Sequence, residues 1–409
     1  MIKLVAPKYP INSSIVLPGS KSISNRLLIL RAVLNSKIKF ENLSDSDDTL
    51  ILAKALGKIK DTGSATIDIQ HAGTDMRFLT AYLAVKEGEW ILSGSDRMKQ
   101  RPIGELVRAL KAIGADISYL EQEGFPPLKI KGKKLAGGRI EIDGSISSQF
   151  ISALLLIGTT FSNGLELILK GEIVSRPYIN MTIQLLKEFG IEFEYSDDRI
   201  RLRSATLNLQ PQTLNIESDW SAASYWYSII ALSKGSQINL EFLSQKSLQA
   251  DSVLPQIFDK LGVTTEFISK GIKLTNKPLE LQEFKYDFTD CPDIAQTLAA
   301  TCVGLGIKAE LKGLQTLKHK ETDRIVALKN ELEKFGVAIQ ITNNSITISA
   351  STLRTPGSEL QTYSDHRMAM SLAVLSLKVS ELKIKDPEVV DKSYSAFWDD
   401  LELSGFDIF

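Results

Sequence analysis

The stretch DCPDIAQTLAATCVGLG, residues 290–306, is a polar turn that runs directly into a helix of small and apolar residues. Five other stretches have the same design, and they begin near Ser20, Gly73, Ser145, Asp219 and Ser364. The successive starts are 53, 72, 74, 71 and 74 residues apart. The chain therefore repeats one element six times, at a period of about 70 residues.

A second series of segments lies between the members of the first. Each is a helix-period segment that ends in Gly and is followed by a β-rich stretch; the glycines are Gly57, Gly114, Gly190, Gly262, Gly336 and Gly405. Glycine is the usual left-handed stop of a helix, so each of these residues is predicted to end one. The two series report the same period independently.

Three repeats make roughly 210 residues, which is a plausible single domain. We therefore predict an α/β protein of two similar halves, with the crossover near Ser218. Helices of the first series are apolar on nearly every side and should be buried at the centre of each half. Helices of the second series are amphipathic and should lie outside.

The composition excludes several classes of protein. The chain has 409 residues, 48 basic and 49 acidic, so its charge predicts no nucleic-acid partner. It has two cysteines, Cys291 and Cys302, too few for a disulfide framework or a four-cysteine zinc site. No run approaches 18 apolar residues, so we expect no membrane span and a cytoplasmic location.

Charged residues gather at the predicted helix starts, where free backbone N–H groups and the helix dipole favour anions. Cations there oppose the dipole, so a bound anion explains them better than helix stability does. Each has a simpler alternative: Ser20, Asp219 and Asp290 could be N-caps, and the run Lys320–Arg324 could be an ion-paired surface turn. His71 and His319 are expected at the surface or at the edge of a site. Asp365–Arg367 is harder to explain this way, because three ionisable groups there precede an apolar helix.

No nucleotide or metal cofactor is expected. The turn from Pro18 to Ser22 lacks the Walker spacing, which needs Gly where this chain has Ser20 and Ile15. No dinucleotide fingerprint opens a helix, and no cluster of metal ligands is apparent.

An ordered set of motifs runs from Pro18 to Lys392. The motifs are PGSKSISNR, AGTDMR, RMKQRPIGELV, SISSQF, SRPYI, the Pro-Asp of TDCPDIA, KETDR and SDHRMAM. Together they resemble the 5-enolpyruvylshikimate-3-phosphate synthases. The resemblance implies two domains, residues 20–217 and residues 1–19 with 218–409. Each would contain three βαβαββ units in an inside-out α/β barrel, with the active site in the cleft between the domains.

The resemblance also implies a reaction. The enolpyruvyl group of phosphoenolpyruvate is transferred to the 5-hydroxyl of shikimate 3-phosphate, and phosphate is released after a tetrahedral intermediate. This is a step of chorismate and aromatic amino acid biosynthesis. Both substrates carry a carboxylate and a phosphate, so about five to six negative charges share one pocket. We expect these two small molecules as the partners of a monomer, with no cofactor.

The site residues are carried over from the matching motifs. Those for shikimate 3-phosphate are Lys21, Ser22, Arg26, Ser147, Ser148, Gln149, Ser175, Asp293 and Lys320, with Tyr178 nearby. Those for phosphoenolpyruvate are Lys21, Gly73, Arg101, Gln149, Arg324, Arg367 and Lys392. Asp293 would accept the 5-hydroxyl proton, and Glu321 would protonate the methylene carbon. Proton transfer by Lys21 is left open by the sequence.

Four positions depart from the family pattern. His71 replaces the usual Asn, Asp75 replaces a small residue, Phe78 stands where Pro is common, and Thr316 stands where Asn is common. These departures leave the reaction class unaffected but bear on the detailed shape around Gly73.

Three other functions compete with this interpretation. A UDP-N-acetylglucosamine enolpyruvyl transferase would normally carry a reactive Cys in its N-terminal half, where this chain has none. A non-catalytic phosphometabolite-binding protein would gain nothing from two carboxylates beside its ligand. An RNA 3′-phosphate cyclase would need a nucleotide and a nucleophilic His, and the near-neutral charge gives no RNA footprint.

Overall fold

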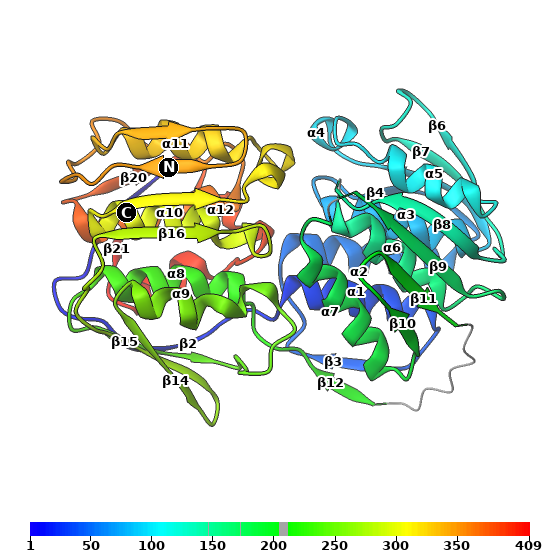
Figure 1. Ribbon diagram of the computed structural model, residues 1–409, viewed down its shortest axis with the longest axis horizontal. Helices are drawn as coiled ribbons and strands as arrows, with labels where there is room; N and C mark the ends of the chain where they lie inside the picture. Colours follow the sequence, from blue (N-terminus) through cyan, green and yellow to red (C-terminus); the bar gives the residue numbers. More distant parts are fainter. Residues whose placement is uncertain (146, 172, 204–211) are drawn as a thin grey trace. The chain divides into compact units, whose positions relative to one another are not determined.

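The structure is a computed structural model that describes residues 1–145, 147–171, 173–203 and 212–409. The chain divides into two compact units (Figure 1). Unit 1 contains Met1–Ser20 and Glu217–Phe409, and unit 2 contains Lys21–Ile216. Each unit is described by itself.

The helices belong to both the buried and the amphipathic series. The α-helices are α1 (Lys21–Val33), α2 (Asp47–Asp61), α3 (Gly73–Val85), α4 (Asp96–Lys99), α5 (Gly104–Ala112), α6 (Ser148–Gly158), α7 (Arg176–Glu188), α8 (Trp220–Leu232), α9 (Leu254–Lys260), α10 (Ala295–Leu305), α11 (Arg324–Glu333), α12 (His366–Ala373) and α13 (Phe397–Leu403). The 3₁₀ helices are η1 (Ala250–Val253), η2 (Pro292–Ile294), η3 (Gln315–His319), η4 (Val374–Lys378) and η5 (Pro387–Lys392).

The strands are short. They are β1 (Ile2–Val5), β2 (Asn12–Val16), β3 (Lys39–Glu41), β4 (Ser64–Asp68), β5 (Gly88–Ser93), β6 (Asp116–Tyr119), β7 (Leu128–Gly132), β8 (Gly138–Asp143), β9 (Leu165–Lys170), β10 (Phe193–Tyr195), β11 (Arg199–Leu202), β12 (Thr213–Asn215), β13 (Gln237–Glu241), β14 (Val263–Ile268), β15 (Gly271–Asn276), β16 (Glu283–Asp287), β17 (Lys308–Lys312), β18 (Ile339–Ile341), β19 (Ile346–Ile348), β20 (Leu382–Ile384) and β21 (Asp407–Ile408).

One sheet of unit 1 gives the rule for the repeat. Strand β16 pairs in parallel with β17, β17 pairs antiparallel with β19, and β19 pairs antiparallel with β18. Helix α10 connects the first pair, and α11 leads to the hairpin, so the order is βαβαββ. The same strand order recurs as β4-β5-β7-β6 and β8-β9-β11-β10 in unit 2.

The first 20 residues complete the other two sheets of unit 1. Strand β2 is the first strand of one repeat, because it lies parallel to β13 in the order β2-β13-β15-β14. Strand β1 lies between β20 and β21 and completes another. These backbone ladders explain why Met1–Ser20 belongs with the C-terminal part of the chain.

The first repeat of unit 2 is smaller than expected. Its described sheet has only two strands, β3 and β12, which pair in parallel. Helix α2 is followed almost directly by β4, with no hairpin between them. The missing hairpin accounts for the short first spacing of 53 residues in the sequence. The prediction that Gly57 ends a helix is wrong, because α2 continues to Asp61 and buries Ile59.

The remaining five glycine stops are confirmed. Gly114, Gly190, Gly262, Gly336 and Gly405 all have positive φ, between 79° and 93°, and each lies two or three residues after the last residue of its helix. This left-handed conformation is the one that glycine adopts without a steric penalty.

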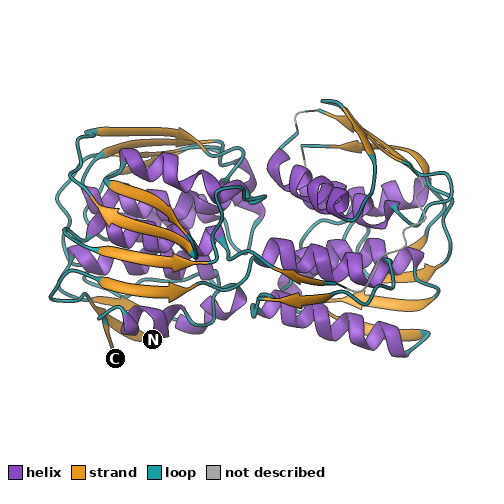
Figure 2. Cartoon of the chain, turned by 90° about the horizontal axis from the view of Figure 1, so that it is seen from below, coloured by secondary structure: helices purple, strands orange, loops and turns teal. Residues whose placement is uncertain are grey.

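Helices of the first series form the interior of each unit, as their composition predicts. Every residue of α8 except Ser221 is buried, and α10 packs between α8 and α12. Figure 2 shows the strands of unit 1, the unit with both chain ends, outside its helices. The α/β fold prediction is confirmed, and among the described residues the sheets are separate and not joined into one hydrogen-bonded barrel.

Candidate functional site

Asp293 lies in η2, immediately before buried helix α10, and is surrounded by cations. Its Oδ1 is 3.2 Å from Lys320 Nζ and 3.5 Å from Arg324 Nη1, and its Oδ2 is 3.3 Å from Arg367 Nη2. The side chain is only 18% exposed. Burial alone would raise the pKa of Asp293, but the charges of Arg367, Lys320 and Arg324 hold it well below its usual range.

Glu321 lies between two other cations. Its Oε2 is 3.0 Å from Arg324 Nη2, and its Oε1 is 2.9 Å from Lys392 Nζ. Lys392 is buried and is the last residue of η5. It does not lie at the start of a helix, because η5 ends with it and α13 begins only at Phe397. The two carboxylates thus share Arg324 as a common partner.

Asp365 fixes the position of both arginines of this group. It accepts from Arg324 Nε at 2.6 Å and from Nη2 at 3.2 Å, and it caps α12 by accepting from Arg367 N at 2.9 Å. The Arg324 and Asp365 side chains are 2% and 0% exposed. Burial would lower the pKa of Arg324, but Asp365, Glu321 and Asp293 raise it above its ordinary value. The sequence indicated an unusual helix start at Asp365, but it did not predict that Asp365 pairs with Arg324.

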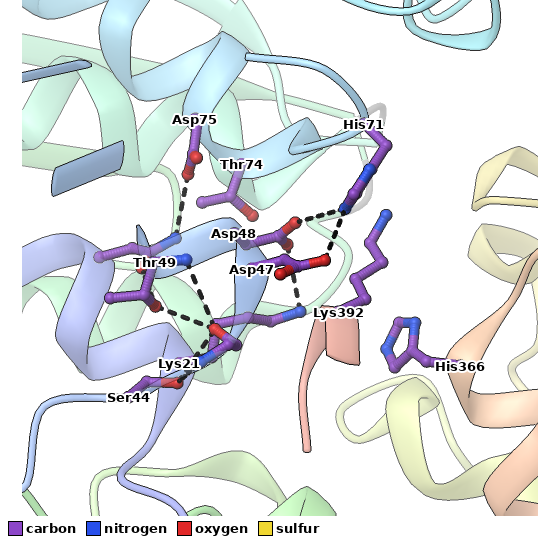
Figure 3. Close-up of polar contacts among 12 residues, drawn as sticks. Lys21, Ser44, Asp47, Asp48, Thr49, His71, Thr74, Asp75, His366 and Lys392 are labelled. Atoms are coloured by element: carbon purple, nitrogen blue, oxygen red, sulfur yellow. Dashed lines mark hydrogen bonds and ion pairs between the residues drawn. The ribbon is translucent and has the colours of Figure 1, made fainter. Parts of the chain in front are cut away.

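In unit 2, Lys21 begins α1 and pairs with a buried carboxylate. Its Nζ is 3.2 Å from Asp48 Oδ2 (Figure 3). His71 Nε2 lies 3.9 Å from oxygens of both Asp47 and Asp48. Sequence reasoning missed Asp48, because an acidic pair in the first turn of a helix after Ser46 is typical of ordinary helix capping.

Arg26 is a buried cation in the same helix, 3% exposed. It donates to Thr182 Oγ1 at 2.8 Å, to Ser22 O at 2.8 Å and, at longer range, to Ser152 Oγ and Tyr178 O. All four acceptors are neutral. Burial lowers the pKa of Arg26 to about 10. A buried guanidinium with neutral partners is a favourable place for an anion.

Phe78 explains one departure from the family pattern. Its ring centroid is 5.5 Å from Cζ of Arg26, so an aromatic face supports the guanidinium. Asp75 explains another, since it is buried and its Oδ1 accepts from Asn25 Nδ2 at 3.0 Å. Thr316 lies in η3, and the structure gives its hydroxyl no partner among the described residues.

Gly73 allows a close approach. A Cβ on this residue would lie 2.2 Å from Arg101 Nη1, so only glycine permits the guanidinium to lie against the start of α3. Nearby, Gln149 Nε2 donates to Thr74 Oγ1 at 3.1 Å. Arg77 donates to Gly73 O at 2.9 Å and to Pro102 O at 3.0 Å. Arg77 therefore holds the backbone in place.

Three serines expected to hold a phosphate lie at the starts of α6 and α7. Ser147 caps α6, with its Oγ accepting from Gln149 N at 3.3 Å. Ser148 is buried in the first turn. Ser175 precedes α7 with a left-handed φ of 53° and makes no capping hydrogen bond. Helix starts offer free N–H groups to an anion.

The predicted site residues thus form two groups, each within its own unit. Unit 1 brings together Asp293, Lys320, Glu321, Arg324, Arg367 and Lys392. Unit 2 contains Lys21, Ser22, Arg26, Gly73, Arg101, Ser147, Ser148, Gln149 and Ser175. Within the described ranges, no three His, Cys, Asp or Glu side chains are placed to bind a metal. None of the described helices has the length and apolar character needed to cross a membrane.

Comparison with known proteins decides the family. The family described as EPSP synthase (3-phosphoshikimate 1-carboxyvinyltransferase) matches residues 5–401. The chain belongs to this family. A protein of Bacteroides fragilis named 3-phosphoshikimate 1-carboxyvinyltransferase is 47% identical over 409 residues, which cover 99% of this chain and 98% of that protein. A protein of the same name from Aliivibrio salmonicida is 36% identical, covering 97% and 98%. The resemblance seen in the sequence is confirmed.

Two solved structures share the fold. The EPSP synthase of Acinetobacter baumannii aligns with a TM-score of 0.80 at 19% identity, covering 100% of this chain and 99% of that one. The enolpyruvyl transferase NikO from Streptomyces tendae aligns with a TM-score of 0.76 at 14% identity, covering 100% and 98%.

Proposed function

We propose that the protein transfers the enolpyruvyl group of phosphoenolpyruvate to the 5-hydroxyl of shikimate 3-phosphate and releases phosphate, a step of aromatic amino acid biosynthesis. The observation that carries this proposal is the pair of carboxylates in unit 1. Asp293 contacts three cations and Glu321 contacts two, with Arg324 shared. The names of the relatives support the same reaction.

The cations around Asp293 give it a role that depends on substrate. Arg367 and Arg324 would receive the acidic groups of phosphoenolpyruvate, because guanidinium groups bind carboxylate and phosphate in a bidentate manner. Once substrate oxygens engage these cations, they stabilise the Asp293 carboxylate less. Burial, which opposes ionisation, then raises the pKa of Asp293. The carboxylate thereby becomes a better base when both substrates are in place.

The proposed chemistry uses each carboxylate once in the addition step. Asp293 accepts the proton of the 5-hydroxyl while the hydroxyl oxygen forms a bond to C2 of phosphoenolpyruvate. Glu321 gives a proton to the methylene carbon, which becomes a methyl group. In elimination the methyl group returns a proton to the Glu321 carboxylate, the double bond forms again, and phosphate leaves with the proton held by Asp293. Lys320 and Lys392 would stabilise the developing negative charge.

Shikimate 3-phosphate would be held mainly by unit 2. Arg26 would bind its carboxylate, and Ser147, Ser148 and Ser175 its phosphate. Lys21 and Arg101 would bind phosphoenolpyruvate, and Gly73 leaves room for the Arg101 guanidinium. A monomer in the cytoplasm stays a prediction.

The test is phosphate release with both substrates, with each alone, and with UDP-N-acetylglucosamine in place of shikimate 3-phosphate. We expect release only with the first pair, and a loss of at least about a hundredfold in Glu321→Gln. Glu402→Gln is the control, because Glu402 is exposed. Binding of both metabolites without phosphate release would support the binding-protein alternative instead.

A further inference from the structure

A buried carboxyl group of unit 1, Asp251, lies next to the cations but has no role in the proposed chemistry. It belongs to η1 and is 3% exposed. Its Oδ2 accepts a hydrogen bond from the hydroxyl of Ser221, in the first turn of α8. The Ser221 oxygen in turn accepts from Arg367 Nη2 at 3.3 Å. The three side chains form one chain of hydrogen bonds.

This arrangement is costly for the fold. Burial and the nearby charge of Asp293 raise the pKa of Asp251 to about 7, although Arg367 and the Ser221 hydroxyl oppose that shift. Its Oδ1 has no hydrogen-bond partner among the described residues. A buried carboxyl without full hydrogen bonding destabilises a protein, so an amide or apolar residue would suit the fold better. The carboxyl group needs another explanation.

The direction of the hydrogen bonds supplies one. A serine hydroxyl has a single hydrogen and two lone pairs. Because the Ser221 hydrogen points to Asp251, its lone pairs are free to face the Arg367 guanidinium. Without Asp251 the hydroxyl could rotate, and Arg367 would lose an oriented acceptor. Asp293 Oδ2 contacts the same Nη2 atom of Arg367 at 3.3 Å.

We propose that Asp251 is a positioning residue for the reaction, which through Ser221 orients the Arg367 guanidinium to receive an acidic group of phosphoenolpyruvate. The inference rests on the proposed function. When substrate and Asp293 compete for Arg367, the Ser221 oxygen remains as an acceptor and keeps the guanidinium in its binding orientation. Such pre-organisation improves substrate binding because less side-chain freedom is lost on association.

The experiment measures KM for each substrate and kcat by phosphate release in the wild type, Asp251→Leu, Ser221→Ala and the double variant; leucine has a similar size but cannot accept the Ser221 hydrogen bond. We expect each single variant to raise KM for phosphoenolpyruvate about 5- to 20-fold, which is of the order of one hydrogen bond to a charged group. The KM for shikimate 3-phosphate and kcat should change less than about threefold. The KM of the double variant for phosphoenolpyruvate should be no higher than that of the more impaired single variant, because both substitutions remove the same interaction.

Glu331→Gln is the matched control. Glu331 is a buried carboxylate of the same unit that accepts from Tyr363 OH at 2.8 Å and Gln361 N at 2.9 Å, away from the proposed chemistry. Its loss should lower stability and leave both KM values unchanged.

Three results would overturn the inference while the wild type stays active. They are an unchanged KM for phosphoenolpyruvate in Asp251→Leu, effects that multiply in the double variant, and a parallel rise of both KM values as in a damaged fold. If Asp251→Leu does not fold, Ser221→Ala decides alone, and an unchanged KM there refutes the proposal. A wild type that releases no phosphate contradicts the proposed function itself.

Discussion

Replacing Arg26 by Met should make the protein more stable while it loses shikimate 3-phosphate. The ordinary pKa of the guanidinium is 12.5, and burial lowers that of Arg26 to about 10. At about 1.4 kcal/mol per pKa unit, the charge destabilises the fold by about 3 kcal/mol. Met has a similar length and no charge to bury.

The hydrogen bonds lost with Arg26 offset only part of this gain. Thr182 Oγ1 still has Ser152 Oγ and Tyr178 O at 2.9 Å each, so these groups keep other partners. We therefore expect a net gain of about 2 kcal/mol, or a rise in Tm of about 4–8 °C for a domain of this size.

Thermal unfolding with and without shikimate 3-phosphate tests both halves of the prediction. At a hundred times Kd the ligand should stabilise the wild type by about 2.7 kcal/mol and Arg26→Met hardly at all. Arg31→Met is the control, since Arg31 lies in the same helix and stacks on Phe40 at 4.9 Å. An Arg26→Met protein that is less stable than the wild type, or that keeps the full ligand-induced shift, would refute the reasoning.

Three further predictions concern single residues. Asp365→Asn should lower the free energy of unfolding by about 2–4 kcal/mol in urea titration, because it leaves the buried Arg324 with fewer partners. Gly73→Ala should raise KM for phosphoenolpyruvate about tenfold by displacing Arg101, with little change in stability. The pKa of Asp251 is about 7 in the folded protein, against an ordinary value of 3.8, so the folded state binds the proton more tightly than the unfolded state does. The stability gained from this proton is lost as the pH rises from about 4 to 7. Asp251→Asn has no carboxyl group to titrate and does not lose this stability. Its free energy of unfolding relative to that of the wild type should therefore increase by up to about 4 kcal/mol between pH 4 and pH 8.

Each has an opposing result, and the first also has a control. Asp399→Asn, at an exposed carboxylate, should leave unfolding unchanged, and an equal effect at Asp365 and Asp399 would contradict the buried pair. An unchanged KM in Gly73→Ala would show that Arg101 is not needed for phosphoenolpyruvate. A stability difference that is the same at pH 4 and pH 8 would contradict the raised pKa of Asp251.

The repeat could be predicted from sequence because each copy needs the same local chemistry. Gly114 and Gly190 end helices in a conformation that other residues rarely adopt, so the stop is visible in the chain itself. The prediction that Gly57 ends a helix was wrong because a glycine within a helix costs only about 1 kcal/mol relative to Ala. Burial of Ile59 offsets that cost. The short first spacing was the signal that a hairpin was missing.

Most cations of the candidate site lie near helix starts that the sequence indicated, but their partners could not be predicted. Lys21 and Asp48 are 27 residues apart, and Ser221 and Asp251 are 30 apart in different elements. Tertiary packing brings such pairs together, and no local pattern encodes the distance. Motifs therefore indicate the charged groups, whereas the hydrogen bonds that orient them depend on the tertiary structure.

Proton and phosphorus NMR of the complete reaction tests the central claim most directly, because it identifies the organic product as well as the phosphate. We predict one phosphate for each new enol ether at the 5-oxygen of shikimate 3-phosphate, and neither signal in Glu321→Gln. Phosphate accompanied by pyruvate, with shikimate 3-phosphate unchanged, would contradict the account.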